Sequence, residues 1–196
     1  MAFTNLETRE INCKVLYLGP QGSGKTANFQ SIYCERGLSL SQDRFQLEPE
    51  KSPFFEFLPL SLGYLKDFQI KLHLYTMTLS PLYKTVLSTL IKGVDGVVFV
   101  YDSRFSALEQ NMNCWRESKE LFSRLGQNLI MLPKVLQYNK RDHQEALPLE
   151  LLRHELNPGG LPEVEATATR SQGTLETVQS IARAVLDQLG EEGVQR

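Results

Sequence analysis

One stretch decides the fold: Gly19-Pro20-Gln21-Gly22-Ser23-Gly24-Lys25-Thr26, which satisfies G-x-x-x-x-G-K-[ST], follows an apolar run and precedes a segment of helical period. Glycines let backbone N–H groups turn inward around phosphate oxygens, and the following helix points its positive end at the same anion. Lys25 would supply charge to the β- and γ-phosphates, and the Thr26 hydroxyl is placed to ligate Mg²⁺. The alternative is a glycine-rich turn that only caps a helix, but the flanking strand and helix favour a phosphate cradle.

Short apolar runs alternate with longer segments of helical period along the chain. This order, with one strand–strand pair, predicts an α/β domain with a mostly parallel six-stranded sheet, one antiparallel hairpin and helices on both faces. Gly63 and Lys66-Asp67 are expected in the turn of the hairpin. The predicted strands are Cys13–Leu18, Phe54–Leu60, Phe68–Tyr75, Gly96–Tyr101, Lys134–Tyr138 and Val164–Thr167.

Hydrophobic periodicity predicts which faces of these elements are buried. Every second residue from Phe68 to Leu74 is apolar, as in a strand with one face on the core. The run Gly96–Tyr101 has no charged or amide side chain, as in a strand that is covered on both faces. Helices are predicted to begin at Lys25, to run from Ser106 to Leu125, and to begin again near Thr174.

Length and charge bound the class of protein. The chain has 196 residues, 41% of them hydrophobic, and we expect one domain over residues 1–190 with a frayed tail at 191–196. The 21 Lys and Arg residues nearly balance the 23 Asp and Glu residues, for a net charge of −2. This balance argues against a broad surface for binding nucleic acid.

The sequence predicts a cytoplasmic protein without a lipid anchor or a membrane span. Residues 1–4 lack the charged start and apolar run of a signal peptide, and no apolar segment approaches the roughly 18–20 residues of a span. Ala2 stands where myristoylation needs glycine, and we find no C-terminal cysteine box for prenylation.

Cysteine and histidine carry no predicted chemistry. The cysteines are far apart and are expected to be buried free thiols in a reducing compartment: Cys13, Cys34 and Cys114. The histidines show no metal-ligand spacing and no neighbouring nucleophile: His73, His143 and His154.

A second motif, Asn139-Lys140-Arg141-Asp142, follows the predicted strand Lys134–Tyr138 at the edge where open α/β sheets bind ligands. The Asp142 carboxylate can accept hydrogen bonds from the N1–H and the exocyclic amine of guanine, a donor pair that adenine lacks. Asn139 is placed to join the base to the cradle, and the Lys140 stem to cover the ring. Such residues are also common in solvated turns, but their order and their place at a strand end indicate a guanine-reading segment.

Together these motifs resemble the Ras superfamily, and most closely the bacterial MglA group of polarity and motility GTPases. The similar stretches span most of the chain: Arg9–Lys14, Phe54–Leu60, His73–Thr76, Gly93–Val100 and Gln137–Asp142. The resemblance implies a Ras-like fold that binds GTP or GDP with Mg²⁺ and has nucleotide-dependent switch loops. It also implies a roadblock-type regulatory partner (MglB in that group), downstream effectors, and a role in cell polarity or surface motility.

The resemblance assigns two further segments. Thr167, Ala168 and Thr169 match the small-residue loop of Ras-like proteins, in which an amide at the Ala168 position meets the guanine carbonyl. Asp102 follows an apolar run and imitates a magnesium ligand. In the Ras-like order, however, the magnesium side lies one element away, near Thr76. We therefore expect Asp102 to be a loop or cap residue before the helix at Ser106.

The hydrolytic segment departs from the family pattern. MglA proteins follow the His-Leu-Tyr-Thr stretch with Pro-Gly-Gln, whose glycine amide senses the γ-phosphate and whose glutamine orients the attacking water. Here Leu79 stands at the glycine and Ser80 at the glutamine, and serine is too short to reach that water. Gln21 stands where the family has glycine and would crowd the γ-phosphate. Ser80 is the candidate catalytic residue at the position of the family's glutamine.

The first switch is also changed. Lys51-Ser52 align with an Arg-Thr pair of the family if no gap precedes Phe54-Phe55. Ser52 would keep a hydroxyl for Mg²⁺ or phosphate, beside Thr26 as the other metal ligand. Lys51, a candidate catalytic residue, keeps a positive charge but loses the Arg fork, which is worth about 10³–10⁵-fold in related phosphoryl transfer.

Three functions stay open from the sequence alone. The first is a guanine-nucleotide switch with impaired or very slow intrinsic hydrolysis. The second is a non-hydrolysing pseudo-GTPase that serves as an interaction module, and the third is another phosphate-loop class such as a nucleotide kinase, which Asn139–Asp142 disfavour. The changed residues Gln21, Leu79 and Ser80 would touch only the reacting phosphate, so we expect the rate to fall more than the affinity.

Overall fold

The computed structural model describes residues 3–5, 7–35, 55–77 and 84–194. It contains one sheet, whose strands are β1 (Phe3–Asn5), β2 (Glu10–Leu18), β3 (Phe55–Leu65), β4 (Phe68–Met77), β5 (Gly96–Asp102), β6 (Lys134–Asn139) and β7 (Glu163–Glu165). Six of them lie in the order β3-β4-β2-β5-β6-β7, and β1 pairs with β2 off this path.

The pairing confirms the predicted fold class. Strand β2 is parallel to β4 and β5, β5 is parallel to β6, and β6 is parallel to β7. Strands β3 and β4 form the expected antiparallel hairpin. Strand β1 adds a second antiparallel pair that the sequence pattern did not predict, because three residues are too few to show an alternation.

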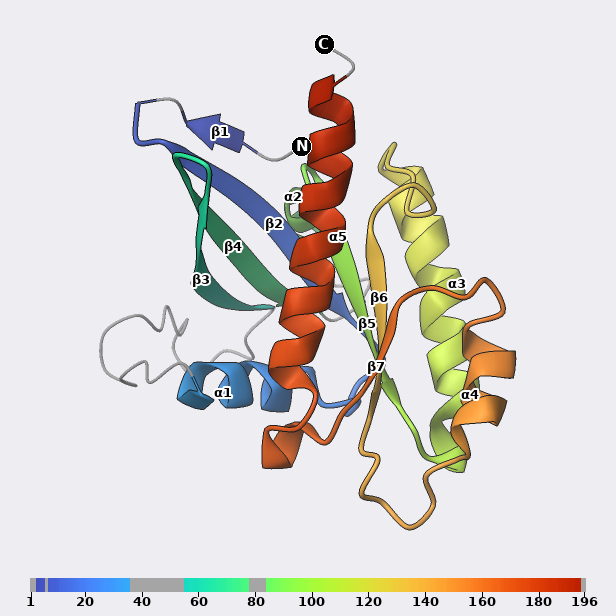
Figure 1. The fold of residues 1–196 in the computed structure, drawn as a ribbon. Coiled ribbons are helices and arrows are strands. Elements are labelled where there is room, and N and C mark those ends of the chain that lie inside the picture. Colours follow the sequence, from blue (N-terminus) through green and yellow to red (C-terminus); the bar gives the residue numbers. More distant parts are fainter. Residues whose placement is uncertain (1–2, 6, 36–54, 78–83, 195–196) are drawn as a thin grey trace.

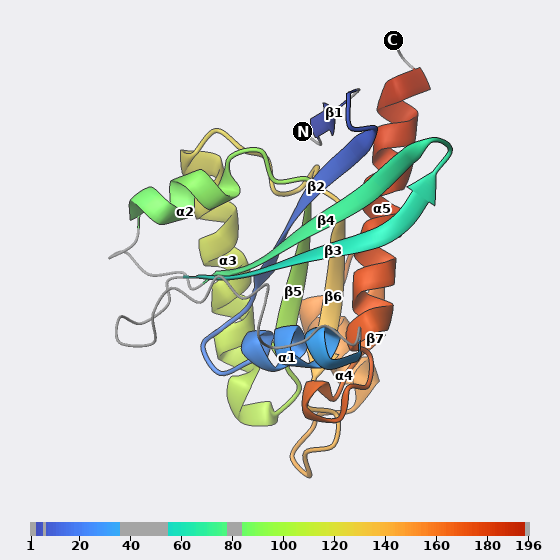
Figure 2. The same ribbon diagram turned by 90° about the vertical axis from the view of Figure 1, so that its left-hand side faces the viewer.

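Helices cover both faces of the sheet, as predicted (Figures 1 and 2). Their bounds are α1 (Lys25–Glu35), α2 (Lys84–Ile91), α3 (Leu108–Arg124), α4 (Leu149–Leu156) and α5 (Thr174–Val194). Side chains of α1 and α5 share one buried cluster, and those of α2, α3 and α4 share the other. The expected starts at Lys25 and Thr174 are confirmed, whereas the segment expected to start a helix at Ser106 first forms a 3₁₀ turn over Phe105–Ala107.

Strand β5 is the centre of the core. All seven of its residues are buried, which confirms the prediction of a strand covered on both faces. Val98 and Val100 belong to the cluster under α1 and α5, whereas Val97, Phe99 and Tyr101 belong to the opposite one. The period-2 alternation of a strand thus divides its side chains between the two helical layers.

The β3–β4 hairpin confirms one prediction and corrects another. Ile70, Leu72 and Leu74 are buried in β4, as their spacing predicted. Gly63, however, lies inside β3 and not in the turn, next to a register shift in the ladder, while Lys66-Asp67 join the strands. Gly63 has φ +107, and glycine tolerates this value, so the strand continues past the irregularity.

The expectation that all three cysteines are buried holds for two of them. Cys13 and Cys114 are buried free thiols as expected, but Cys34 is exposed near the end of α1, so that prediction was wrong. Among the described residues, no helix is both long enough and apolar enough to cross a membrane.

Candidate functional site

The site lies where parallel strands end. Gly19 directly follows β2, and Asp102 and Asn139 are register partners that end β5 and β6. From β2 the chain reaches β4 on one side and β5 on the other, so the strand order reverses at this point. Such reversals leave a crevice at the carboxyl edge of an open α/β sheet, where ligands bind.

The cradle Gly19–Thr26 forms a compact turn at the start of α1. The Lys25 ammonium donates to the carbonyl oxygens of Gly19 at 2.8 Å and of Pro20 at 2.9 Å, and the residue is 9% exposed. Burial lowers the pKa of Lys25. A phosphate beside the ammonium would oppose that shift, because an opposite charge favours the protonated form.

Two glycines of the cradle are fixed by close approach. A Cβ at Gly19 would overlap the carbonyl oxygen of Val100, and a Cβ at Gly24 would overlap the side-chain amide of Asn139. Gly24 also has φ +103, which L side chains rarely adopt. The guanine-reading segment therefore lies directly against the cradle, and position 24 has no room for a residue larger than glycine.

Asn139 joins three segments of the site. Its Nδ2 donates to the Ser23 carbonyl oxygen at 2.8 Å, and its Oδ1 accepts from the Ala168 N–H at 3.0 Å. The residue is 2% exposed. Asn139 thus ties the cradle to the small-residue loop, and the Ala168 amide, which the resemblance assigns to the guanine carbonyl, donates to Asn139 here.

These segments enclose a pocket of about 410 Å³. Its walls include six residues that the sequence predicted: Gly24, Asn139, Lys140, Asp142, Ala168 and Thr169. Three further lining residues were missed: Ala27, His143 and Gln144. His143 and Gln144 directly follow Asp142, and Ala27 directly follows Thr26, so the only signal for these three residues was their position next to the two motifs.

The other candidate residues are placed as follows. Gln21, Gly22 and Thr26 are exposed along the cradle and the first turn of α1. Ser23 is buried, and no hydrogen-bond partner of its hydroxyl is found among the described residues. Thr167 is buried and its backbone pairs with that of Gln172 in an isolated antiparallel β-bridge. The remaining candidates lie outside the described residues: Lys51, Ser52, Leu79 and Ser80.

Asp102 is neither a loop residue nor a helix cap, so that prediction was wrong. It is the last residue of β5 and is 3% exposed, and its carboxylate accepts from Lys140 Nζ at 2.8 Å and from Arg104 Nη2 at 2.7 Å. The ladder extends one pair beyond the apolar run, and a buried carboxylate there needs positive partners. Among the described residues, no group of three or more His, Cys, Asp and Glu side chains could hold a metal ion.

The charge balance around Asp102 sets its protonation. Burial acts to raise the pKa of this carboxyl, but hydrogen bonds from Arg104 and Lys140 outweigh burial and hold the pKa below its ordinary value. Lys140 itself has φ +63, so its backbone turns sharply after β6 while its side chain lies against Asp102. Asp102 therefore stays ionised and orients the second residue of the guanine-reading segment.

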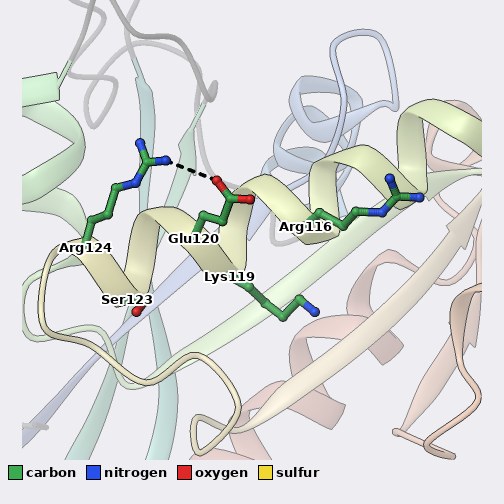
Figure 3. Close-up of a pocket in the computed structure, with 5 residues that line it drawn as sticks. All are labelled: Arg116, Lys119, Glu120, Ser123 and Arg124. Atoms are coloured by element: carbon green, nitrogen blue, oxygen red, sulfur yellow. Dashed lines mark hydrogen bonds and ion pairs between the residues drawn. The ribbon is translucent and has the colours of Figure 1, made fainter.

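A second hollow, of about 540 Å³, lies along the outer side of α3 (Figure 3). Its lining residues are Arg116, Lys119, Glu120, Ser123 and Arg124, and Arg124 pairs with Glu120 at 3.1 Å. None of the site residues predicted from the sequence lines this hollow. Gly24 of the cradle and the guanine-reading segment thus line the pocket at the strand ends and not this hollow.

The geometry agrees with a comparison against known proteins. Over 195 residues the chain is 39% identical to the mutual gliding-motility protein MglA of Myxococcus xanthus (strain DK1622), covering 98% of this chain and 100% of that protein. The chain belongs to the MglA family. This membership confirms the resemblance to a Ras-like small GTPase that the two motifs indicated, although no protein-family model matches the chain.

Proposed function

We propose that this member of the MglA family is a guanine-nucleotide-binding switch protein that acts in cell polarity or surface motility, with impaired or very slow intrinsic GTP hydrolysis. The proposal includes cytoplasmic action, a roadblock-type regulator and downstream effectors. The family relationship supports the cellular role, since the relative is named as a gliding-motility protein. The pocket supports the ligand.

One observation carries the choice of guanine nucleotide. A single pocket is lined both by Gly24 of the cradle and by Asn139 and Asp142 of the guanine-reading segment. A carboxylate at Asp142 selects a base edge with two donors, and a buried Lys25 ammonium beside the loop selects phosphate. We assign the guanine carbonyl to the small-residue loop, where Ala168 and Thr169 both line the pocket.

The cradle also fits a magnesium ion that the phosphates share. Mg²⁺ prefers oxygen ligands and binds nucleotides with few protein groups. Thr26 offers an exposed hydroxyl in the first turn of α1, next to Lys25. We assign the ion to Thr26 and Ser52, and when bound it would neutralise charge on the phosphates.

Slow hydrolysis follows from the residues that replace the family's catalytic groups. Ser80 is too short to orient an attacking water, and Lys51 lacks the planar fork of Arg. Gln21 puts a side chain where a glycine would leave room beside the γ-phosphate. These changes leave Lys25, Asn139 and Asp142 in place, so binding is retained while the rate falls.

The base reader is tested by Asp142→Asn. Removing the carboxylate loses two charge-assisted hydrogen bonds, and we expect the affinity for GTP to fall on the order of a hundredfold or more. Xanthine carries a carbonyl where guanine carries the amine, so the amide of the variant should favour XTP. Titration with labelled GTP and XTP measures both. An unchanged preference for GTP would remove Asp142 from this role.

Hydrolysis is tested in two steps. Denaturing the purified protein should release guanine nucleotide, and a single-turnover assay should show little GTP cleavage with the protein alone. Restoring the family residues with Leu79→Gly and Ser80→Gln should raise the rate, and adding a roadblock-type partner tests regulation. Fast cleavage by the unmodified protein would contradict our interpretation of Leu79 and Ser80, and retained GTP without any turnover would identify a pseudo-GTPase.

A further inference from the structure

Three fully buried polar side chains lie beneath the site and take part in none of the roles assigned so far. Asn28 comes from α1, Gln137 from β6 and Thr177 from α5, and each is 0% exposed. Burying a carboxamide costs free energy unless its donors and acceptors find partners. Two such groups in one core therefore need a complete set of hydrogen bonds.

The three side chains supply that set to one another. Asn28 Nδ2 donates to Gln137 Oε1 at 2.8 Å, and Gln137 Nε2 donates back to Asn28 Oδ1 at 2.7 Å. The second proton of Gln137 Nε2 goes to Thr177 Oγ1 at 2.8 Å. Two antiparallel hydrogen bonds between these planar carboxamides fix both the distance and the orientation of α1 against β6.

The ends of this chain of bonds reach the segments of the nucleotide site. Asn28 Nδ2 also donates to the carbonyl oxygen of Gly24 in the cradle, at 3.0 Å. Gln137 lies two residues before Asn139 on the same strand, so both side chains point to the same face. Thr177 Oγ1 donates to the Gly173 carbonyl oxygen at 2.6 Å, just after the small-residue loop.

We propose that Asn28, Gln137 and Thr177 are positioning residues that hold the guanine-reading segment at a fixed distance from the phosphate cradle and so set how long a guanine nucleotide stays bound. The inference rests on the proposed function, because it presupposes that a nucleotide spans both segments. A nucleotide bound at its base and its phosphates at once needs that distance to match its length, and small displacements cost affinity.

The fold offers a matched control for the bridge formed by Asn28, Gln137 and Thr177. Ser31 and Thr174 also join α1 to α5, through a buried hydrogen bond of 2.8 Å between their hydroxyls. Among the described residues, neither hydroxyl of this pair forms a hydrogen bond with Gly24, Asn139 or the small-residue loop. Loss of this bond should therefore weaken the packing of α1 on α5 without changing the distance between cradle and base reader.

The experiment measures release of fluorescently labelled GDP after a chase with unlabelled GDP, together with the Tm of the nucleotide-free protein. We expect Gln137→Met to speed release about tenfold or more, Thr177→Val to speed it less, and Ser31→Ala to leave it near the wild-type rate. The double variant Asn28→Leu/Gln137→Met removes both amides and leaves neither without its partner. Its Tm should therefore be higher than that of Gln137→Met, while its release of GDP should stay fast.

The outcomes separate the two proposals. If wild-type protein does not bind labelled GDP, the proposed function fails. If wild-type protein binds it, and Thr177→Val and the double variant release it as slowly as Ser31→Ala does, the positioning role is overturned. Release that follows Tm across all variants, with no excess for the bridge residues, also overturns the positioning role. Thr177→Val is nearly isosteric, so it gives an answer even if Gln137→Met does not fold.

Discussion

Two residues of the guanine-reading segment are supported in opposite ways. Asn139 lies above a neutral bridge, in which Asn28, Gln137 and Thr177 exchange hydrogen bonds without any formal charge. Lys140 is held by an ionic support instead, through Asp102, which also binds Arg104. Both supports are buried at their centre, yet only the ionic one depends on protonation and on ions in solution.

The difference teaches where each kind of bond can be used. The neutral bridge is 0% exposed at all three residues, and an ion there would meet a large desolvation cost. Lys140 and Arg104 keep 29% and 33% of their side chains exposed, so water still solvates the cations that face Asp102. A charge is therefore used at the rim of the pocket, and an amide pair is used beneath it.

The largest expected effect comes from removing the centre of the ionic support. Asp102→Ala leaves Lys140 and Arg104 without their shared carboxylate, and we expect a loss of roughly 2–3 kcal/mol in the free energy of unfolding, below the 3–5 of fully buried pairs because both cations are partly solvated. Urea unfolding of Asp102→Ala and of the isosteric Asp102→Asn measures this effect. Equal, small losses in both variants would show that the carboxylate charge contributes nothing.

The neutral bridge should give the next largest effect. Asn28→Leu leaves the Gln137 carboxamide without its reciprocal partner, and we expect a loss of about 1–2 kcal/mol in nucleotide-free protein. Adding Gln137→Met should recover part of that loss, because two apolar groups replace a matched polar pair. Strictly additive losses in a double-mutant cycle would contradict the coupling between the two amides.

Acid distinguishes the two supports directly. The pKa of Asp102 is lowered in the folded protein, so its contribution to stability is full above the ordinary Asp pKa of about 3.9 and is lost as pH falls through the lower folded value. The stability difference between wild type and Asp102→Asn should therefore shrink below about pH 4. The difference between wild type and Thr177→Val should stay constant over the same range. Parallel pH profiles for both pairs would contradict this assignment.

The smallest expected effect is at the outer rim. Arg170 Nη2 lies 3.4 Å from Asp142 Oδ2, and its side chain is 65% exposed. Solvated ion pairs of this kind contribute little, so Arg170→Ala should change the free energy of unfolding by less than about 0.5 kcal/mol. A larger loss in thermal unfolding would place Arg170 among the supports of the guanine-reading segment.

The supports differ in how far the sequence reveals them. The strands and the two motifs follow from local patterns, such as the apolar run before Gly19 and the N-K-x-D residues after β6. Gln137 does carry a signal, since an amide inside a buried strand needs a partner. Its partner Asn28 is 109 positions away and looks like any polar helix residue, so only the packing of α1 on β6 brings them together. The same holds for Asp102. The sequence predicted a loop or cap residue there, and only the pairing of β5 with β6 brings Asp102 next to Lys140.

The three thiols differ in a way that makes this protein simple to study by spectroscopy. Burial raises the pKa of Cys13 to about 12 and that of Cys114 to about 11, so both stay protonated and shielded at neutral pH. Cys34 is exposed near the end of α1, the helix that begins in the cradle and carries Asn28. A maleimide dye or spin label should therefore attach there without mutagenesis, and its signal would report how the far end of that helix responds when a nucleotide enters or leaves.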